Sequence, residues 1–145
     1  FIAYLRATAG VEPAPKLIVS TGNVAFGVVR AMLLLGQFNY GKRGILDLTH
    51  TRLFTFASLQ RLFKQAGFEV LQTRGIPAPF PLAVGDSWLS RLMLLANEAL
   101  IHVDRRLFSY QMFTVVQPQP TLDYLLEHAQ TNSAERAKRM PGAAA

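Results

Sequence analysis

Hydrophobic residues along this chain fall into two patterns, short unbroken runs and stripes with helical spacing. Three runs rich in β-branched or aromatic residues predict strands: KLIVS from Lys16, FEVLQTR from Phe68 and LFSYQMFTVVQ from Leu107, which ends before Pro118. The KLIVS run is apolar enough for a buried strand of a mostly parallel sheet. Because helix-spaced segments separate the three runs, the pattern predicts an α/β fold.

The most distinct helix is predicted between Thr55 and Gly67. Thr55 is a good N-cap residue, and Gly67 accommodates the left-handed conformation that ends many helices. The apolar stripe between them consists of Leu59, Leu62, Phe63 and Ala66.

Further helices are expected around this core. Residues 24–35 form a helix that is apolar nearly all round, so it needs cover beyond one sheet face. Asp86 or Ser87 caps a helix that runs to about Val103. A helix end is predicted before Gly10, and a short helix starts at about Thr121 and frays beyond residue 131.

Two segments read as loops. Residues 36–48 hold three glycines with the aromatic residues Phe38 and Tyr40, a composition suited to a ligand-facing segment. Aromatic residues in such a loop more often pack on the neighbouring helix than on a ligand. Residues 75–85 contain three prolines and predict an extended, irregular loop.

Composition narrows the chemistry. The chain has no cysteine, which excludes thiol chemistry and is compatible with a reducing cytoplasm. Its three histidines lie far apart and lack metal-ligand spacing, so no metal is expected. The net charge of +6 comes mainly from dispersed arginines, which favours no nucleic-acid partner and fits a solvated basic surface. No apolar stretch is long enough to predict a transmembrane helix.

One stretch carries a resemblance, GILDLTHTRLFTFASLQRLFKQAGFEV from Gly44 to Val70. It resembles the segment after the fifth strand of class I S-adenosylmethionine-dependent methyltransferases that act on small molecules. The upstream KLIVSTGN is similar to the family's fifth strand and its end, and FSYQMFTVVQP is similar to its antiparallel last strand. The positions that match the central motif are Asp47, His50, Arg52, Phe54, Thr55, Ser58, Leu59, Ala66, Gly67 and Phe68.

The resemblance implies that residues 1–120 are the carboxyl-terminal half of a Rossmann-like methyltransferase sheet, with three strands, the last one antiparallel, and flanking helices. Residues 121–145 then form the short helix and tail. The family's Gly-x-Gly-x-Gly loop, which holds S-adenosylmethionine, has no counterpart in this chain, so the fragment is expected to be inactive alone. Gly22 and the VEPAP segment depart from the family's usual turn residues.

The resemblance also nominates site residues at the carboxyl ends of the strands. His50 is the candidate base, since its unperturbed pKa lies near neutrality. Asn23, Tyr40, Asp47 and Arg52 are candidates for binding a small-molecule acceptor. Structural roles remain open for these residues. Asn23 could cap a helix, Asp47 and Arg52 could pair with each other or with the backbone and hold the shape of the loop, and His50 could donate to a backbone carbonyl.

A function of another class is also open. The apolar 24–35 helix and an unpaired edge of the KLIVS strand would suit a non-catalytic module that forms a homodimer. Peripheral membrane contact through the same helix is a weaker possibility, because that helix lacks a charged face.

Overall fold

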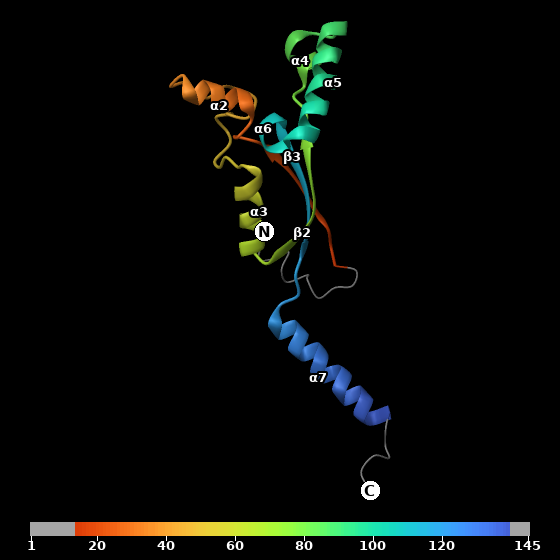
Figure 1. The fold of residues 1–145 in the computed structure, drawn as a ribbon. Helices are drawn as coiled ribbons and strands as arrows, with labels where there is room; N and C mark the ends of the chain where they lie inside the picture. Colours follow the sequence, from red (N-terminus) through yellow and green to blue (C-terminus); the bar gives the residue numbers. More distant parts are fainter. Residues whose placement is uncertain (1–13, 140–145) are drawn as a thin grey trace.

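The computed structural model describes residues 14–139, which form three strands and six helices (Figure 1). The predicted helix end before Gly10 lies outside these residues. In chain order the elements are β1 (Leu17–Gly22), α2 (Gly27–Leu34), α3 (Phe56–Gln65), β2 (Phe68–Ile76), α4 (Phe80–Val84), α5 (Trp88–Val103), α6 (Arg105–Phe108), β3 (Gln111–Pro118) and α7 (Leu122–Arg139).

The three strands form one sheet in the order β1-β3-β2. β3 lies in the centre and runs antiparallel to both neighbours, so β1 and β2 run in the same direction. The α/β class and the antiparallel last strand are thereby confirmed. The unpaired edge expected for KLIVS is confirmed, since β1 lies at an edge of this sheet. The expectation of a buried strand in a mostly parallel sheet is wrong for the described residues, because Ile18 is 63% exposed and β1 pairs antiparallel with β3.

One face of the sheet is covered by α3. The helix begins at Thr55, whose side chain accepts a hydrogen bond from the Ser58 amide while the Ser58 hydroxyl accepts one from the Thr55 amide. Gly67 follows with φ +76°, as predicted. The buried core between α3 and the sheet consists of Phe56, Leu59, Phe63, Phe68, Met112 and Val116.

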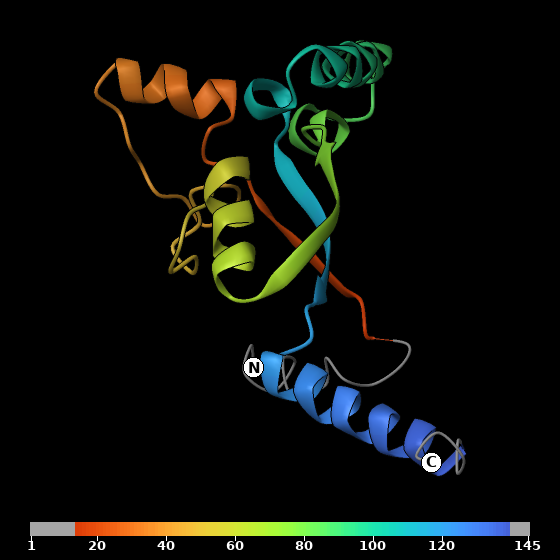
Figure 2. The ribbon, with the colours of Figure 1, turned by 60° about the horizontal axis from the view of Figure 1, so that its bottom comes forward.

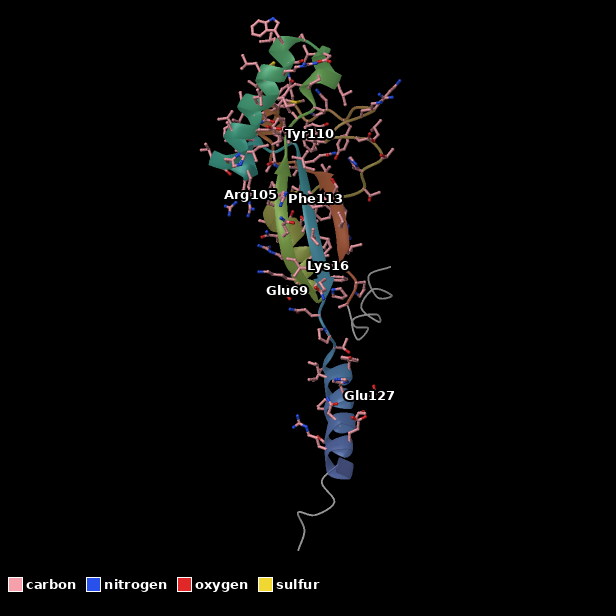
Figure 3. All side chains as sticks on the ribbon, turned by 90° about the vertical axis from the view of Figure 1, so that its right-hand side faces the viewer. Lys16, Glu69, Arg105, Tyr110, Phe113 and Glu127 are labelled. Carbon is pink, nitrogen blue, oxygen red and sulfur yellow. The ribbon has the colours of Figure 1, made fainter. Side chains whose placement is uncertain are left out.

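The opposite face of the sheet is much more open. Figure 3 views the sheet from this side, with Phe113 near the middle of β3 and Lys16 and Glu69 toward the end near α7. Along β3 the buried residues Met112, Thr114, Val116 and Pro118 alternate with half-buried neighbours that point to the open face. The described residues therefore form a sheet with one well-covered side.

Two short helices, α4 and α6, were not predicted from the sequence. The segment expected to be wholly irregular contains α4, because Pro81 lies in the first turn, where a missing N–H costs no helical hydrogen bond. The third strand begins at Gln111 and not at Leu107, because the Asp104 side chain accepts a hydrogen bond from the Arg106 amide and starts α6 there.

The ends of β1, α2 and α7 also differ from the predicted ones. β1 continues to Gly22 through residues predicted as a loop, since β3 supplies partners as far as Gln111. α2 begins at Gly27, three residues later than predicted, and Phe26 precedes it without a side-chain cap. α7 continues to Arg139, beyond the predicted fraying point, and projects away from the sheet in both views (Figures 1 and 2).

Candidate functional site

A hollow of about 260 Å³ lies at the carboxyl end of β1, between α2 and the loop that follows it. Its walls are mainly apolar, with Arg43 and Asn39 as polar members. The lining residues are Phe26, Val28, Val29, Met32, Asn39, Gly41, Arg43, Gly44, Ile45, Leu46 and Tyr110. An open apolar hollow with few polar groups is suited to an apolar small molecule.

Tyr110 forms one wall of this hollow and was not among the predicted site residues. In Figure 3 it lies at the end of the sheet where β3 begins. Its backbone N–H donates to the Ile76 carbonyl at 2.9 Å, and its ring packs edge to face on Phe26 with 5.8 Å between centroids. Its hydroxyl lies close to Gly44, where an added methyl group would come within 3.3 Å of it. The only sequence signal was an aromatic residue within the third predicted strand.

The loop beside the hollow is folded back on itself. The Gly41 amide donates to the Leu46 carbonyl at 2.8 Å, and the Leu48 amide donates to the Gly41 carbonyl at 3.2 Å. These bonds hold Ile45 and Leu46 buried, while Gly44 before them is exposed and Asp47 after them is half-buried. The predicted ligand-facing loop thus has a defined shape and supplies four residues in a row, from Arg43 to Leu46, to the hollow.

The structural alternative for Asp47 was a bond to Arg52 or to the backbone, and the structure shows the backbone bond and no ion pair with Arg52. Its Oδ1 accepts hydrogen bonds from the backbone amide and the hydroxyl of Thr49, both at 2.7 Å. These two bonds, the backbone one first, together with the nearby His50, lower the pKa of Asp47 below its ordinary value of 3.8. Asp47 therefore shapes the loop as a carboxylate, and its Oδ1 is engaged within it.

His50 is exposed next to the same loop. Its Nδ1 lies 3.3 Å from the Ile45 carbonyl oxygen, the backbone contact that was expected as its structural role. When Nδ1 carries the proton and donates it to this carbonyl, Nε2 is left as the acceptor. The contact is therefore compatible with a base as well as with a purely structural residue.

Tyr40 and Arg52 are exposed beside the hollow but do not line it. Tyr40 packs edge to face on Phe38 with 5.5 Å between centroids, and both rings remain more than 40% exposed. The guanidinium of Arg52 has no ion-pair partner among residues 14–139.

Asn23 lies beneath the site, fully buried, and is neither the N-cap of α2 nor open to a ligand. Its Nδ2 donates to the carbonyls of Arg106 and Ser109, each at 2.9 Å, and its Oδ1 accepts from the Ala25 amide. Its two Nδ2 bonds join the end of β1 to the segment before β3, and its Oδ1 bond shapes the turn that follows β1. In this structure its role is to position Tyr110.

Asn97 holds the same segment from the other side, and the sequence interpretation missed it. Its Nδ2 donates to the Phe108 carbonyl at 2.9 Å, and its Oδ1 accepts from the Ala78 amide at 2.9 Å. Its signal in the sequence was a single amide in an otherwise apolar stretch of helix. The two buried asparagines fix the chain on both sides of α6.

The site has no metal-binding character. Within residues 14–139 no cluster of three histidine, aspartate or glutamate side chains could hold a metal ion.

None of the described helices is both long enough and apolar enough to cross a membrane.

The glycines present do not form a cradle for S-adenosylmethionine. Gly27 begins α2, but its α-carbon faces the Leu107 side chain and carbonyl, so protein and not ligand fills the space there. Gly44 faces the Tyr110 hydroxyl. At both glycines, protein atoms thus occupy the space that a close-lying ligand would need.

A scan against models of known protein families gives no match to this sequence, and a search of curated proteins gives none.

Proposed function

We propose that this chain is the carboxyl-terminal half of a class I S-adenosylmethionine-dependent methyltransferase domain and forms the wall that holds a small, apolar acceptor. The observation that carries the proposal is the sheet. The strands that the resemblance makes the fifth and sixth, β1 and β2, run in the same direction, and the last strand runs antiparallel to both.

The position of the hollow supports the same function. It lies at the carboxyl end of β1, the side of an α/β sheet where ligands bind. Its apolar walls and its size suit a small molecule whose reacting group points to the rim. The open sheet face and the edge position of β1 fit a domain whose remaining strands and helices lie elsewhere.

The chain's own contribution to methyl transfer is orientation and proton removal. Because the transfer is an in-line displacement, rigid placement of the acceptor supplies much of the rate. The folded 41–48 loop and the ring of Tyr110 give that rigidity. His50 Nε2 accepts the proton of an acceptor hydroxyl, while the Ile45 carbonyl keeps the proton on Nδ1. S-adenosylmethionine supplies the methyl group and is bound by residues outside this chain.

The first test is the coding sequence upstream of Phe1. We expect a strand followed by Gly-x-Gly-x-Gly, and an unrelated sequence there would contradict the proposal. Calorimetric titration of the isolated chain with S-adenosylmethionine should give no binding heat. Tight binding by residues 1–145 alone would mean that the cofactor site has been misassigned.

The polypeptide that includes this upstream region allows a test of His50. His50→Gln should lower methyl transfer from labelled S-adenosylmethionine by about 10²–10⁴-fold, the usual contribution of a general base. Thr51→Ala is the matched control, because Thr51 is the next residue, is exposed and has no assigned role. Equal activity of both variants would remove His50 from the mechanism.

A non-catalytic pairing module is the second candidate, favoured by the exposed apolar residues of α2 and the edge of β1. Leu34 is 88% exposed on α2, and Ile18 is 63% exposed on β1. Light scattering tests this candidate. A dimer that Leu34→Asp or Ile18→Asp dissociates would support it, and a strict monomer would contradict it.

A further inference from the structure

We propose that the outward face of α5 is a self-association surface, through which two copies of this chain pair with their α5 helices antiparallel. This inference is independent of methyl transfer and concerns a different surface from α2 and the β1 edge.

α5 faces its own protein with an unusual set of residues. Ser90 and Asn97 are buried, and Leu94 and Ile101 are half-buried between and beyond them. These four positions recur every three to four residues, so they mark one side of the helix. Two of the four inward positions are polar, which is the reverse of the usual amphipathic helix.

The outward side is apolar along the whole helix. Trp88, Leu92, Leu95, Ala99 and Val103 follow one another at spacings of four, three, four and four residues and are all exposed. The exposed fractions are 76% for Trp88, 53% for Leu92, 63% for Leu95 and 80% for Val103. Leu89, Met93, Ala96 and Leu100 flank this line on one side. No charged residue of α5 lies in this stripe, which is the seam pattern of paired helices.

A second copy fits this stripe in shape. Antiparallel pairing about a two-fold axis between residues 95 and 96 brings Trp88 opposite Val103 of the partner subunit. The same axis brings Leu92 opposite Ala99 of the partner subunit, and Leu95 opposite Ala96 of the partner subunit. Each large side chain then faces a smaller one, as interdigitated packing requires. A two-fold contact is also closed, so it yields a dimer and not a filament.

The charges beside the stripe are self-complementary. Arg91 and Glu98 lie on the other flank of the helix, two turns apart. In the antiparallel pair, Arg91 lies within two residues of Glu98 of the partner subunit along the axis, about 3 Å. Arg91 pairs with Asp86 in the single chain. Because the Arg91 side chain is exposed in that pair, it remains accessible to Glu98 of the partner subunit. From α4 to α6 the acidic residues Asp86, Glu98 and Asp104 balance the basic residues Arg91, Arg105 and Arg106. Because these charges cancel, the surface has no net attraction for an anionic bilayer, and a second copy of the chain is the favoured partner.

The exposed apolar surface favours a weak dimer. Seven large apolar side chains of α5 are exposed between 38% and 80%. Specific complexes at the low end of the size range bury about 1,200 Å² in total, somewhat more than half of it apolar. We therefore expect weak, reversible dimerisation.

Sedimentation of the full chain over about 1 μM to 1 mM tests the proposal, since this range brackets weak association. The wild type should pass from monomer to dimer, and Leu95→Asp should stay monomeric with an unchanged circular dichroism spectrum. Leu34→Asp, on exposed α2, is the control and should dimerise as the wild type does. A monomer at every concentration, or dissociation by Leu34→Asp instead of Leu95→Asp, would overturn the proposal.

Because the chain has no cysteine, single cysteines report the register directly. Leu95→Cys, beside the proposed axis, should cross-link to itself under mild oxidation. Trp88→Cys and Val103→Cys should each cross-link poorly alone but well when mixed. Cross-linking of Leu34→Cys as fast as Leu95→Cys would contradict the register.

A bilayer is the competing occupant. Wild type and Leu95→Asp are compared for flotation with vesicles of three parts phosphatidylcholine to one part phosphatidylserine. Neither should float with them. Vesicle binding that Leu95→Asp abolishes in a monomeric wild type would assign the stripe to lipid and overturn the dimer.

Discussion

α3 and α5 begin in the same way and expose their apolar residues in opposite ways. Each helix starts with a hydroxyl N-cap whose partner is a serine three residues later, Thr55 with Ser58 and Ser87 with Ser90. α3 buries Leu59 and Phe63 against the sheet, whereas α5 buries Ser90 and Asn97 and exposes all its leucines except Leu94. Capping therefore sets where a helix begins, and the partner surface decides which of its faces becomes core.

The largest difference between α3 and α5 is expected when a leucine is truncated and the free energy of unfolding is measured. Leu59→Ala removes a side chain that is only 3% exposed and should lower the free energy of unfolding by about 2–4 kcal/mol. Leu95→Ala, on the outward face of α5, should change it by less than about 0.5 kcal/mol below the dimerisation range. Urea denaturation of both variants checks this. Similar losses would mean that α5 has a cover inside the chain.

The inward asparagine of α5 should matter more than its outward leucines. Asn97→Ala leaves the Ala78 amide and the Phe108 carbonyl without their partner and should cost about 1–3 kcal/mol. Faster hydrogen exchange at the Ala78 amide would locate the loss. Glu98→Ala, the exposed next residue, is the control and should leave both stability and exchange unchanged.

The two caps allow a closer comparison. Thr55→Ala and Ser87→Ala should each cost about 1 kcal/mol, because each removes the oxygen that accepts from an N3 amide. The loss at Thr55 should appear in global unfolding, since α3 carries the main core. The loss at Ser87 should appear mainly as local fraying at the start of α5, measured by amide exchange. Equal global losses would contradict this division.

The smallest expected effect is a pH dependence at Asp47, in the loop that leads to α3. Hydrogen bonds from Thr49 lower the pKa of Asp47 in the folded chain, so its stabilising contribution is complete above its ordinary value of 3.8. The contribution is lost as the pH falls through the lower folded pKa. Asp47→Asn should therefore flatten the acid limb of unfolding midpoints against pH. An unchanged acid limb would contradict this assignment.

Local signals in the sequence were accurate where they required only nearby residues. Thr55, Ser87 and Gly67 marked helix ends that the structure confirms, because capping involves contacts within a few positions. Asp104 caps α6, and Pro81 lies in the first turn of α4. Neither helix was predicted, because the apolar run suggested a strand and the prolines suggested a loop. Runs of apolar residues favoured a strand at Leu107 because periodicity does not distinguish a short helix from a strand start.

The candidate site was harder to predict than the helices. Asp47, His50 and the 36–48 loop were identified, but Tyr110 and the two buried asparagines act through contacts with residues distant in sequence. Asn23 was placed correctly at the end of a strand, yet its side chain turns inward to carbonyls more than 80 residues away. No local pattern encodes such a contact.

The sequence by itself determined the α/β class, the capped helices and the three strands, since periodicity and capping are local properties. Only the tertiary structure decided that β3 lies between β1 and β2, that the α3 stripe is core, and that the equally apolar α5 stripe faces outward. The physical reason is that hydrophobic patterning specifies a face to be buried, while the position of neighbouring elements specifies which surface buries it.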